Sequence, residues 1–392
     1  MFKTALQNFT LKGKSLLPVV QGGMGVGVSA HRLAGTVASF GAMGTISSVD
    51  QRRHHPDLME QTSGKLRTKE NIDAANLVAL DREIKKALQL AKGQGMVAVN
   101  IMRAVSEYAR SVRQACESGA HAVVVGAGLP LDLPDLTKEF SKVAIVPVLS
   151  DVRGISLLLK KWMRKNRLPD AIVIENPHHA AGHLGVAKAD DLKKEGVYES
   201  PTVLEGTLQL FKDMGIESEN IPLIVAGGVH EHEQVRDLLD QGASAVQLGT
   251  AFAVSQEGDA HINFKKTLAE ARPEDTVVFN STAGLPARAV RTPWLENYLA
   301  KLDRLQTIAK ERPCTAGFDC LIQCGWRDGI DKHGQFCIDT QLAFALQGDI
   351  KRGLFFRSSE PLPFGSAIRP VRELLEYLLT GLRPGAHQGA AA

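Results

Sequence analysis

The chain contains eight short apolar runs that alternate with helix-like segments, and this alternation limits the possible folds more than any other feature. The runs are rich in β-branched residues and lead into Gly, Ser, Asn or Pro, as strands followed by loops do. In order, they span residues 16–23, 41–47, 96–102, 121–128, 143–150, 170–177, 222–228 and 244–252. Their continuous apolar character indicates parallel strands covered by helices. Eight such units within about 250 residues predict a (β/α)8 TIM barrel, with a doubly wound open sheet as the weaker alternative.

Three of the segments between these runs have clear helical patterns, at residues 31–40, 105–119 and 231–242. Two of them end at Gly119 and Gly242, where glycine commonly terminates a helix. We therefore expect helices between the barrel strands.

Two regions do not fit a plain strand and helix alternation. The connection from Ser48 to Gly95 is too long for one loop, so we expect its polar part to form an excursion over the barrel mouth. After Phe252 the pattern becomes helical, near residues 257–271, 294–311, 341–356 and 371–382. We predict a barrel domain at 1–255, including the excursion at 48–95, and a helical C-terminal extension at 256–392 whose last eight residues, GAHQGAAA, are frayed.

Composition excludes several classes of function. The 46 basic and 43 acidic residues give a net charge of +3 without a polybasic stripe, so neither nucleic acid nor an anionic membrane is an expected partner. The N-terminus lacks the apolar core of a signal peptide, and no apolar run approaches the roughly eighteen residues of a membrane span. We expect a soluble, cytoplasmic protein that acts on a small molecule.

Glycines gather at the ends of three predicted strands. The first ends in QGGMGVG, where Gly22 and Gly23 permit close approach of the backbone to a ligand, although a tight turn would need the same residues. The last two end in AGGV and LGTAF, and glycine-rich loops at these positions of a barrel commonly hold a cofactor phosphate. Alternatively, Gly227, Gly228 and Gly249 merely end their strands.

The other strand ends are small and almost uncharged. Asn100 can pair with a planar heterocycle or cap the next helix, and Gly126, Gly128 and Ser150 leave room for a flat ring. Paired carboxylates and metal ligands are missing from these ends, which argues against metal-dependent hydrolysis and aldolase chemistry. The pattern points to a bound redox cofactor that carries the reaction.

His183 follows the sixth predicted strand, within the glycine-flanked sequence AAGHLG. A histidine on such a loop has little packing role, and its ordinary pKa suits proton transfer near neutral pH. His178 and His179 stand close by in sequence, and for these two we expect solvent-facing or supporting roles.

Four ordered motifs, QGGM at 21–24, AAGHLG at 180–185, AGGV at 226–229 and GASAVQLGTAF at 242–252, resemble the nitronate monooxygenase (2-nitropropane dioxygenase) family. That family includes related flavin-dependent enoyl-acyl-carrier-protein reductases and NAD(P)H:quinone reductases. The resemblance covers about residues 14–255. It implies FMN at the barrel mouth and His183 at the position of the family's active-site histidine. The positions that it assigns to the flavin ring or its phosphate, together with Ser150 from the strand ends, are Gly22, Gly23, Met24, Asn100, Ser150, Ala181, Gly182, Ala226, Gly227, Gly228, Gly249 and Thr250.

The resemblance implies oxidation of an alkyl nitronate with O2 to a carbonyl compound and nitrite. An NAD(P)H-dependent reductase acting on enoyl thioesters or quinones is the alternative, and a flavin-binding subunit without catalysis is a third. A homodimer is compatible with any of them. His178 and Ala181 depart from the usual pattern of the family's histidine loop, which makes the substrate the least determined part of the prediction.

Cys314, Cys320, Cys324 and Cys337 fall within one short stretch with spacings C-x5-C, C-x3-C and C-x12-C. Four thiols can hold zinc or an iron–sulfur cluster, but these spacings match neither the C-x2-C zinc pattern nor the common ferredoxin run. We therefore expect reduced thiols that pack the extension and no bound metal.

Overall fold

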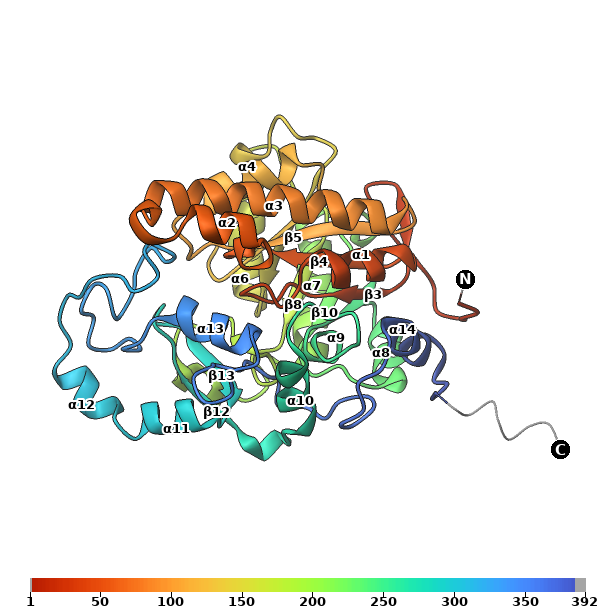
Figure 1. The fold of residues 1–392 in the computed structure, drawn as a ribbon. Coiled ribbons are helices and arrows are strands. Elements are labelled where there is room, and N and C mark those ends of the chain that lie inside the picture. The colour runs from red at the N-terminus through yellow and green to blue at the C-terminus, as the bar shows by residue number, and fades with distance from the viewer. Residues whose placement is uncertain (1, 385–392) are drawn as a thin grey trace.

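The computed structural model describes residues 2–384, and its centre is a closed barrel of eight parallel strands (Figure 1). Each of the eight apolar runs contributes one barrel strand, so the predicted TIM barrel is confirmed. β11 pairs with β3 and thereby closes the barrel. The barrel strands are β3 (Val19–Gln21), β4 (Met43–Ser47), β5 (Met96–Met102), β6 (Ala122–Gly126), β7 (Ala144–Leu149), β8 (Ile172–Glu175), β10 (Leu223–Ala226) and β11 (Ala245–Leu248).

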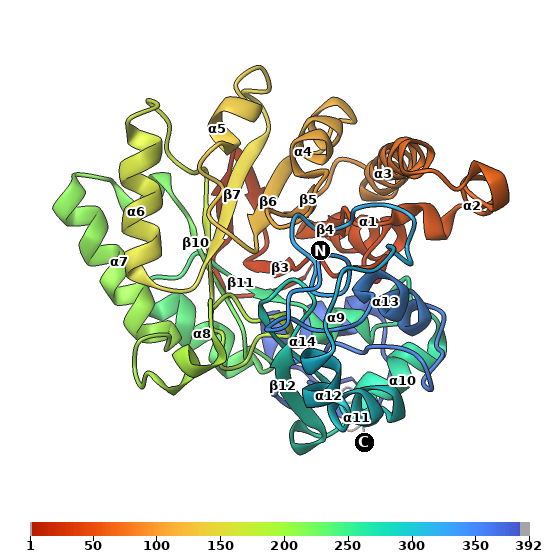
Figure 2. The same cartoon turned by 90° about the vertical axis from the view of Figure 1, so that its left-hand side faces the viewer.

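Helices surround the barrel, as Figure 2 shows for the face that carries α4 to α8. The predicted terminating glycines Gly119 and Gly242 follow α4 and α8 with φ of +89° and +105°. The helices between strands are α1 (His31–Ser39), α2 (Pro56–Gln61), α3 (Lys69–Ala91), α4 (Tyr108–Glu117), α5 (Leu133–Leu136), α6 (Val152–Met163), α7 (Ser200–Met214) and α8 (His232–Asp240). None of the helices in residues 2–384 is both long enough and apolar enough to cross a membrane.

Apolar side chains fill two layers. One layer lies inside the barrel and includes Val20, Ala98 and Ile224, while the other lies between the strands and the helices and includes Val99, Trp162 and Phe211. The N-terminal hairpin, β1 (Phe9–Leu11) with β2 (Lys14–Leu16), adds its apolar side chains to the interior layer and so covers one end of the barrel.

The segment 48–95 is more helical than its polar sequence suggests. Its second half is α3, a helix of 23 residues that begins at a Thr68 cap and packs on α1. Its first half contains α2 and two short 3-10 helices, η1 (Gln51–His54) and η2 (Gly64–Leu66).

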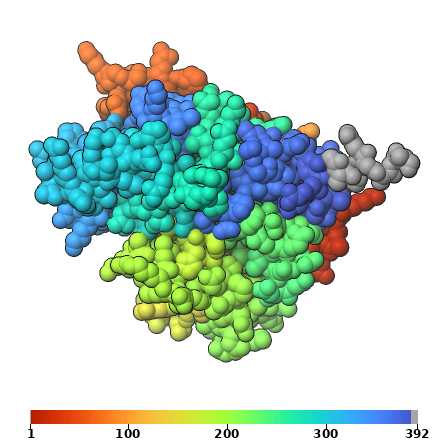
Figure 3. All heavy atoms as spheres, turned by 90° about the horizontal axis from the view of Figure 1, so that it is seen from below, coloured from red at the N-terminus to blue at the C-terminus, as the bar shows by residue number. Residues whose placement is uncertain are grey.

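Helices follow the barrel strands, as predicted. They are α9 (Thr250–Ala253), α10 (Ile262–Glu270), α11 (Pro293–Leu299), α12 (Leu302–Thr307), α13 (Ile338–Leu346) and α14 (Val371–Thr380). Figure 3 shows residues after the barrel as a continuous cyan and blue surface over one side of the molecule. The residues expected to fray, 385–392, lie outside the described part of the chain.

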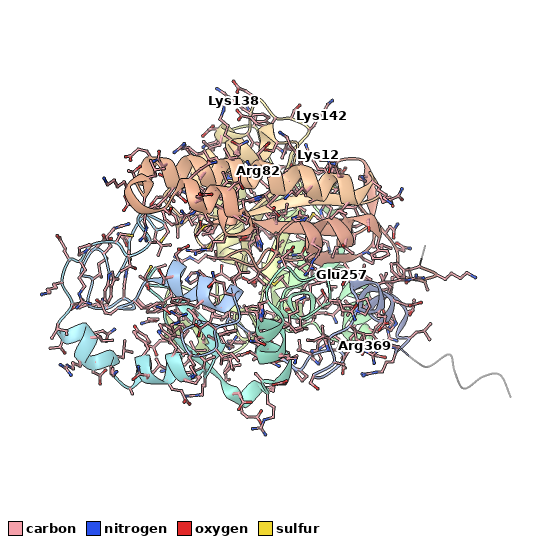
Figure 4. All side chains as sticks on the ribbon, in the orientation of Figure 1. Lys12, Arg82, Lys138, Lys142, Glu257 and Arg369 are labelled. Atoms are coloured by element: carbon pink, nitrogen blue, oxygen red, sulfur yellow. The ribbon has the colours of Figure 1, made fainter. Side chains whose placement is uncertain are left out.

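α14 packs against α1, α8 and β3 and thus fills the eighth helical position around the barrel. Glu257, labelled in Figure 4, accepts a hydrogen bond from the Val371 amide at the start of this helix (2.8 Å). The division of the chain after residue 255 stays a proposal. The barrel strands end before this point, but α14 beyond it still packs on the barrel.

The extension also contains a hairpin that the sequence analysis did not predict. β12 (Thr276–Asn280) pairs with β13 (Pro286–Val290), and β13 pairs with β9 (Gly182–His183) in an antiparallel sheet of three strands. The run TVVFN before the turn-forming STAG was the available signal.

Candidate active site

The polar layer at the barrel mouth follows from the alternation of side chains along the strands. Ala98 belongs to the interior layer and Val99 to the outer layer, so Asn100 points into the barrel. The same alternation directs Glu175 inward from β8 and Gln247 inward from β11. β10 lies between these two strands, and its Ala226 is the register partner of Glu175 on one side and of Gln247 on the other. Both residues therefore lie at the same level of the barrel. Asn100 is among the predicted site residues, whereas Glu175 and Gln247 were missed.

The QGGM loop lies in close contact with this polar layer. A Cβ atom added to Gly23 would lie 2.3 Å from Cβ of Asn100, and one added to Gly22 would lie 3.2 Å from Cδ of Gln247. No side chain fits at Gly23 without displacing Asn100. The backbone of the first strand end therefore forms part of the wall of the mouth, and the expected approach of a ligand to Gly22 and Gly23 stays a prediction.

The two glycine-rich loops after β10 and β11 lie side by side because these strands are neighbours in the barrel. Gly227 and Gly228 both have φ of +89°, and a Cβ atom on Gly227 would lie 2.6 Å from the Asn176 carbonyl oxygen. Gly249 directly precedes α9, which begins at Thr250. The predicted phosphate positions are thus brought together by the fold.

His183 does not lie on a free loop. With Gly182 it forms β9, which pairs with Ala287 and Arg288 of β13. The next amide, that of Leu184, donates to the Pro286 carbonyl (2.9 Å). The extension thus supplies the sheet that holds the histidine. The sequence did not predict this pairing, because β13 is distant from β9 along the chain.

The His183 imidazole is half-buried and has one polar partner. Its Nε2 lies 2.8 Å from Oγ of Ser281, and its ring centroid lies 6.1 Å from that of Phe356. Burial lowers the pKa of His183 to about 4, because the charged imidazolium loses hydration there. His183 is therefore neutral at physiological pH.

Glu175 ends β8 at the mouth, eight positions before His183. Burial raises the pKa of its carboxyl to about 7. A Cβ atom on Gly185 would lie 2.5 Å from Oγ of Ser150 and 3.9 Å from Oε2 of Glu175, so the histidine segment passes over both side chains. Ser150 Oγ donates to the Gly185 carbonyl (3.2 Å). The sequence contains a signal for Glu175: in the strand IVIE, alternate residues point into the barrel, and Glu175 falls on an inward position.

The two other histidines separate in space. His178 contacts Glu199 (3.1 Å) and the Leu192 carbonyl (2.9 Å) through its two ring nitrogens. His179 lies against Gly228, where an added Cβ would be 3.0 Å from its Cγ, and its Nδ1 is 2.6 Å from Oε1 of Glu360. His178 therefore contacts the segment that precedes α7, whereas His179 lies beside the predicted phosphate loop.

Comparison with known proteins identifies relatives of this chain. A family model described as nitronate monooxygenase matches residues 9–340. A curated relative described as "Probable nitronate monooxygenase" from Bacillus subtilis (strain 168) is 27% identical over 301 residues, which cover 74% of this chain and 81% of the relative.

Solved structures agree on the fold. FabK from Thermotoga maritima aligns with a TM-score of 0.59 and 22% identity, covering 92% of this chain and 91% of that one. Nitroalkane oxidase from Streptomyces ansochromogenes aligns with a TM-score of 0.62 and 17% identity, covering 92% and 94%. At such identities the two structures support the barrel architecture alone.

Proposed function

This chain belongs to the nitronate monooxygenase family, and from that premise we propose that it is an FMN-dependent enzyme that oxidises alkyl nitronates with O2 to a carbonyl compound and nitrite. The observation that carries the proposal is His183, held by pairing with β13 beside a barrel mouth whose walls are glycine backbone and small side chains. We assign His183 to proton transfer and the mouth to the flavin.

The geometry of the mouth fits FMN. The wall at Gly23 and Asn100 has no space for a larger residue, and it is uncharged, as a flat heterocycle requires. Gly227 and Gly228 both have positive φ, a backbone conformation in which successive amides can turn toward an anion, which suits a phosphate. Gly22, Gly23, Met24, Asn100, Ser150, Ala181 and Gly182 would surround the ring, and Ala226, Gly227, Gly228, Gly249 and Thr250 would hold the phosphate.

Bound FMN would supply the electron transfer between substrate and O2. The chain's own contribution is proton handling at His183. When Nε2–H donates to Oγ of Ser281, the lone pair at Nδ1 is available to accept a proton from the carbon next to the nitro group of a neutral nitroalkane, which converts it to the nitronate that is oxidised. General base catalysis of this kind typically contributes about 10²- to 10⁴-fold in rate.

The lowered pKa of His183 favours the neutral imidazole, which can accept a proton and would hold a preformed nitronate by hydrogen bonding rather than by charge.

Two measurements test the proposal. We expect nitrite release and O2 consumption when the purified flavoprotein is mixed with propionate 3-nitronate in air. Under anaerobic conditions, we expect NADH and NADPH to leave the flavin absorbance unchanged over the time of one catalytic turnover. Complete bleaching by a pyridine nucleotide without nitrite release would replace the proposal by a reductase. Bleaching by neither compound would favour a flavin-binding subunit.

A further inference from the structure

The loop after β8 places His179 against the glycine-rich loop after β10. The Asn176 amide donates to the Ala226 carbonyl (2.8 Å), and the His179 amide donates to the Asn176 carbonyl (3.2 Å). A Cβ atom added to Gly228 would lie 3.0 Å from Cγ and 3.2 Å from Cδ2 of His179. The imidazole therefore lies directly on a glycine that we assign to the flavin phosphate.

A strap from the extension, residues 355–360, holds the imidazole from its other side. Nδ1 of His179 lies 2.6 Å from Oε1 of Glu360. The Ser358 amide donates to the Thr250 hydroxyl oxygen (3.2 Å) in the loop after β11. The strap therefore connects the two predicted phosphate loops, through His179 on one side and Thr250 on the other.

The two ring nitrogens of His179 differ in their surroundings. Because the Glu360 carboxylate only accepts hydrogen bonds, the nitrogen beside it, Nδ1, carries a proton. Nε2 has no hydrogen-bond partner in the part of the chain that the structure describes. It is bonded to Cδ2, and the Cδ2 edge of the ring faces Gly228. Nε2 is thus the free polar atom of this side chain, on the edge nearer the phosphate loop.

Other basic side chains near these loops are engaged with backbone carbonyls. His230 contacts the Gly228 carbonyl through Nδ1 (2.7 Å), and Arg288 donates to the Ala180 carbonyl (2.5 Å). Arg357 donates to three carbonyls at 2.7 to 3.2 Å. His179 differs from these three because its ring packs on Gly228 and keeps one nitrogen without a partner in residues 2–384.

The phosphate positions that the family resemblance assigns lack a positive charge. They are Ala226, Gly227, Gly228, Gly249 and Thr250, and all five are neutral. A phosphate monoester carries a charge of about −1.5 to −2 at pH 7. Backbone amides can donate to it, but withdrawing its charge from water costs less when a cation also donates a hydrogen bond.

We propose that His179, as the imidazolium, binds the phosphate of FMN through Nε2–H while Glu360 accepts from Nδ1–H. This inference rests on the proposed FMN cofactor, and it adds a charged residue to a site whose assigned positions are neutral. The Glu360 carboxylate balances the charge of the ring from the other side. Because Glu360 and Ser358 belong to the strap, the extension closes the phosphate end of the flavin site.

Riboflavin, which is FMN without its phosphate, makes the proposal testable on the full-length protein after removal of its flavin. His179→Gln removes the positive charge and keeps a hydrogen-bonding side chain beside Glu360. We expect it to weaken FMN binding by about tenfold, the usual difference between a charged and a neutral hydrogen bond, and to leave riboflavin binding unchanged. Quenching of flavin fluorescence measures both dissociation constants.

His178→Gln is the matched control, because both ring nitrogens of His178 already have partners, Glu199 and the Leu192 carbonyl. This variant should keep the wild-type ratio of FMN to riboflavin affinity. An unchanged ratio in His179→Gln, or an equal loss of affinity for both flavins, would overturn the proposal. A wild type that binds FMN no more tightly than riboflavin would do the same.

A second measurement needs no variant, so it covers the case in which His179→Gln does not fold. Diethyl pyrocarbonate acylates accessible imidazole nitrogens, and the His179 side chain is 35% exposed. We expect bound FMN to protect His179 and bound riboflavin to leave it reactive, as measured by mass spectrometry of peptides from the wild type. Equal acylation with the two flavins would contradict the proposal. Neither readout depends on nitronate turnover, so the proposed reaction and the role of His179 can fail separately.

Discussion

Glu83 is fully buried and Glu175 is half-buried, and their surroundings shift the pKa values of the two carboxyls in opposite directions. Glu83, on α3, is fully buried and accepts hydrogen bonds from the His31 amide (2.8 Å) and the His31 ring (2.6 Å), with His55 at 3.0 Å. Burial alone would raise its pKa, but these hydrogen bonds hold the pKa of Glu83 well below its usual range. Glu175 has no ion pair within residues 2–384, so burial raises its pKa to about 7.

The same contrast extends to the two sides of the mouth. On the side of the 48–95 segment, Asp50 and Asp339 both pair with Arg53 (2.5 and 2.6 Å), which ties that segment to α13. On the side of β8 and β9, Glu175 and His183 have no charged partner in the part of the chain that the structure describes. Paired groups fix a structure, whereas unpaired groups with shifted pKa values are available for proton transfer.

The largest expected effect is on turnover. We expect His183→Ala to lower kcat for a neutral nitroalkane by about 10²- to 10⁴-fold, because the proton acceptor is lost. FMN content should stay at the wild-type value, and a preformed nitronate should lose less rate. His178→Ala, which removes contacts to Glu199, the Leu192 carbonyl and the Tyr198 ring, is the control. Loss of FMN with normal turnover per remaining flavin would make His183 a structural residue.

The next largest effect is on stability. We expect Glu83→Ala to lower the free energy of unfolding by about 3 kcal/mol, because removing one partner leaves buried polar groups unpaired. Asp57→Ala breaks an exposed pair with Arg82 (2.8 Å) and should cost far less, because water solvates both partners. Urea unfolding of both variants measures the difference. Equal losses would mean that the buried network contributes no more than a surface ion pair.

The pH dependence of stability separates the two glutamates. The pKa of Glu83 is lowered by folding, so its contribution is present above the unfolded pKa of about 4.3 and is lost as the pH falls below it. The pKa of Glu175 is raised, so its contribution is present below about 4.3 and is lost as the pH rises through 7.

We therefore expect Glu175→Gln to gain stability over the wild type between pH 5 and pH 8, by on the order of 1 kcal/mol. Denaturant unfolding of the variant and the wild type at pH 5 and at pH 8 measures this gain in the free energy of unfolding. A difference between variant and wild type that does not change with pH would show that Glu175 has an ordinary pKa.

The smallest effect concerns the partner of His183. Ser281→Ala removes the hydrogen bond to His183 (2.8 Å) and the one that the Ala283 amide donates to the same hydroxyl (3.2 Å). The bond to His183 is worth about 1 kcal/mol, so we expect a loss of about fivefold in kcat/KM. The acidic limb of the pH profile should shift, and Ser281→Thr should restore both values. An unchanged profile would show that the hydroxyl does not position the imidazole.

The fold was predictable to a large extent. Each barrel strand is a local apolar run, and each terminating glycine acts within its own helix, so the sequence contains these signals directly. The hairpin β12–β13 was missed because TVVFN is short and stands among helical segments. The position of α14 was unpredictable, because it follows β11 by more than a hundred residues and packs where the eighth helix of the barrel belongs.

The site was predictable only in part. The alternation along β5 identifies Asn100, and the same argument applied to β8 and β11 would have identified Glu175 and Gln247. The roles of the predicted FMN residues remain predictions, and so does the role of His183. The expectation that the four cysteines hold no metal stays a prediction, which metal analysis of the purified protein tests.

The sequence by itself determined the barrel, the glycine-rich strand ends and the histidine that follows the sixth strand. These features depend on neighbours within a few residues. Only the tertiary structure decided that His183 joins a sheet with β13, that its partner Ser281 comes from 98 residues further along the chain, and that four cysteines share one cavity. Such pairings are chosen by packing between distant segments, and no local pattern of residues specifies them.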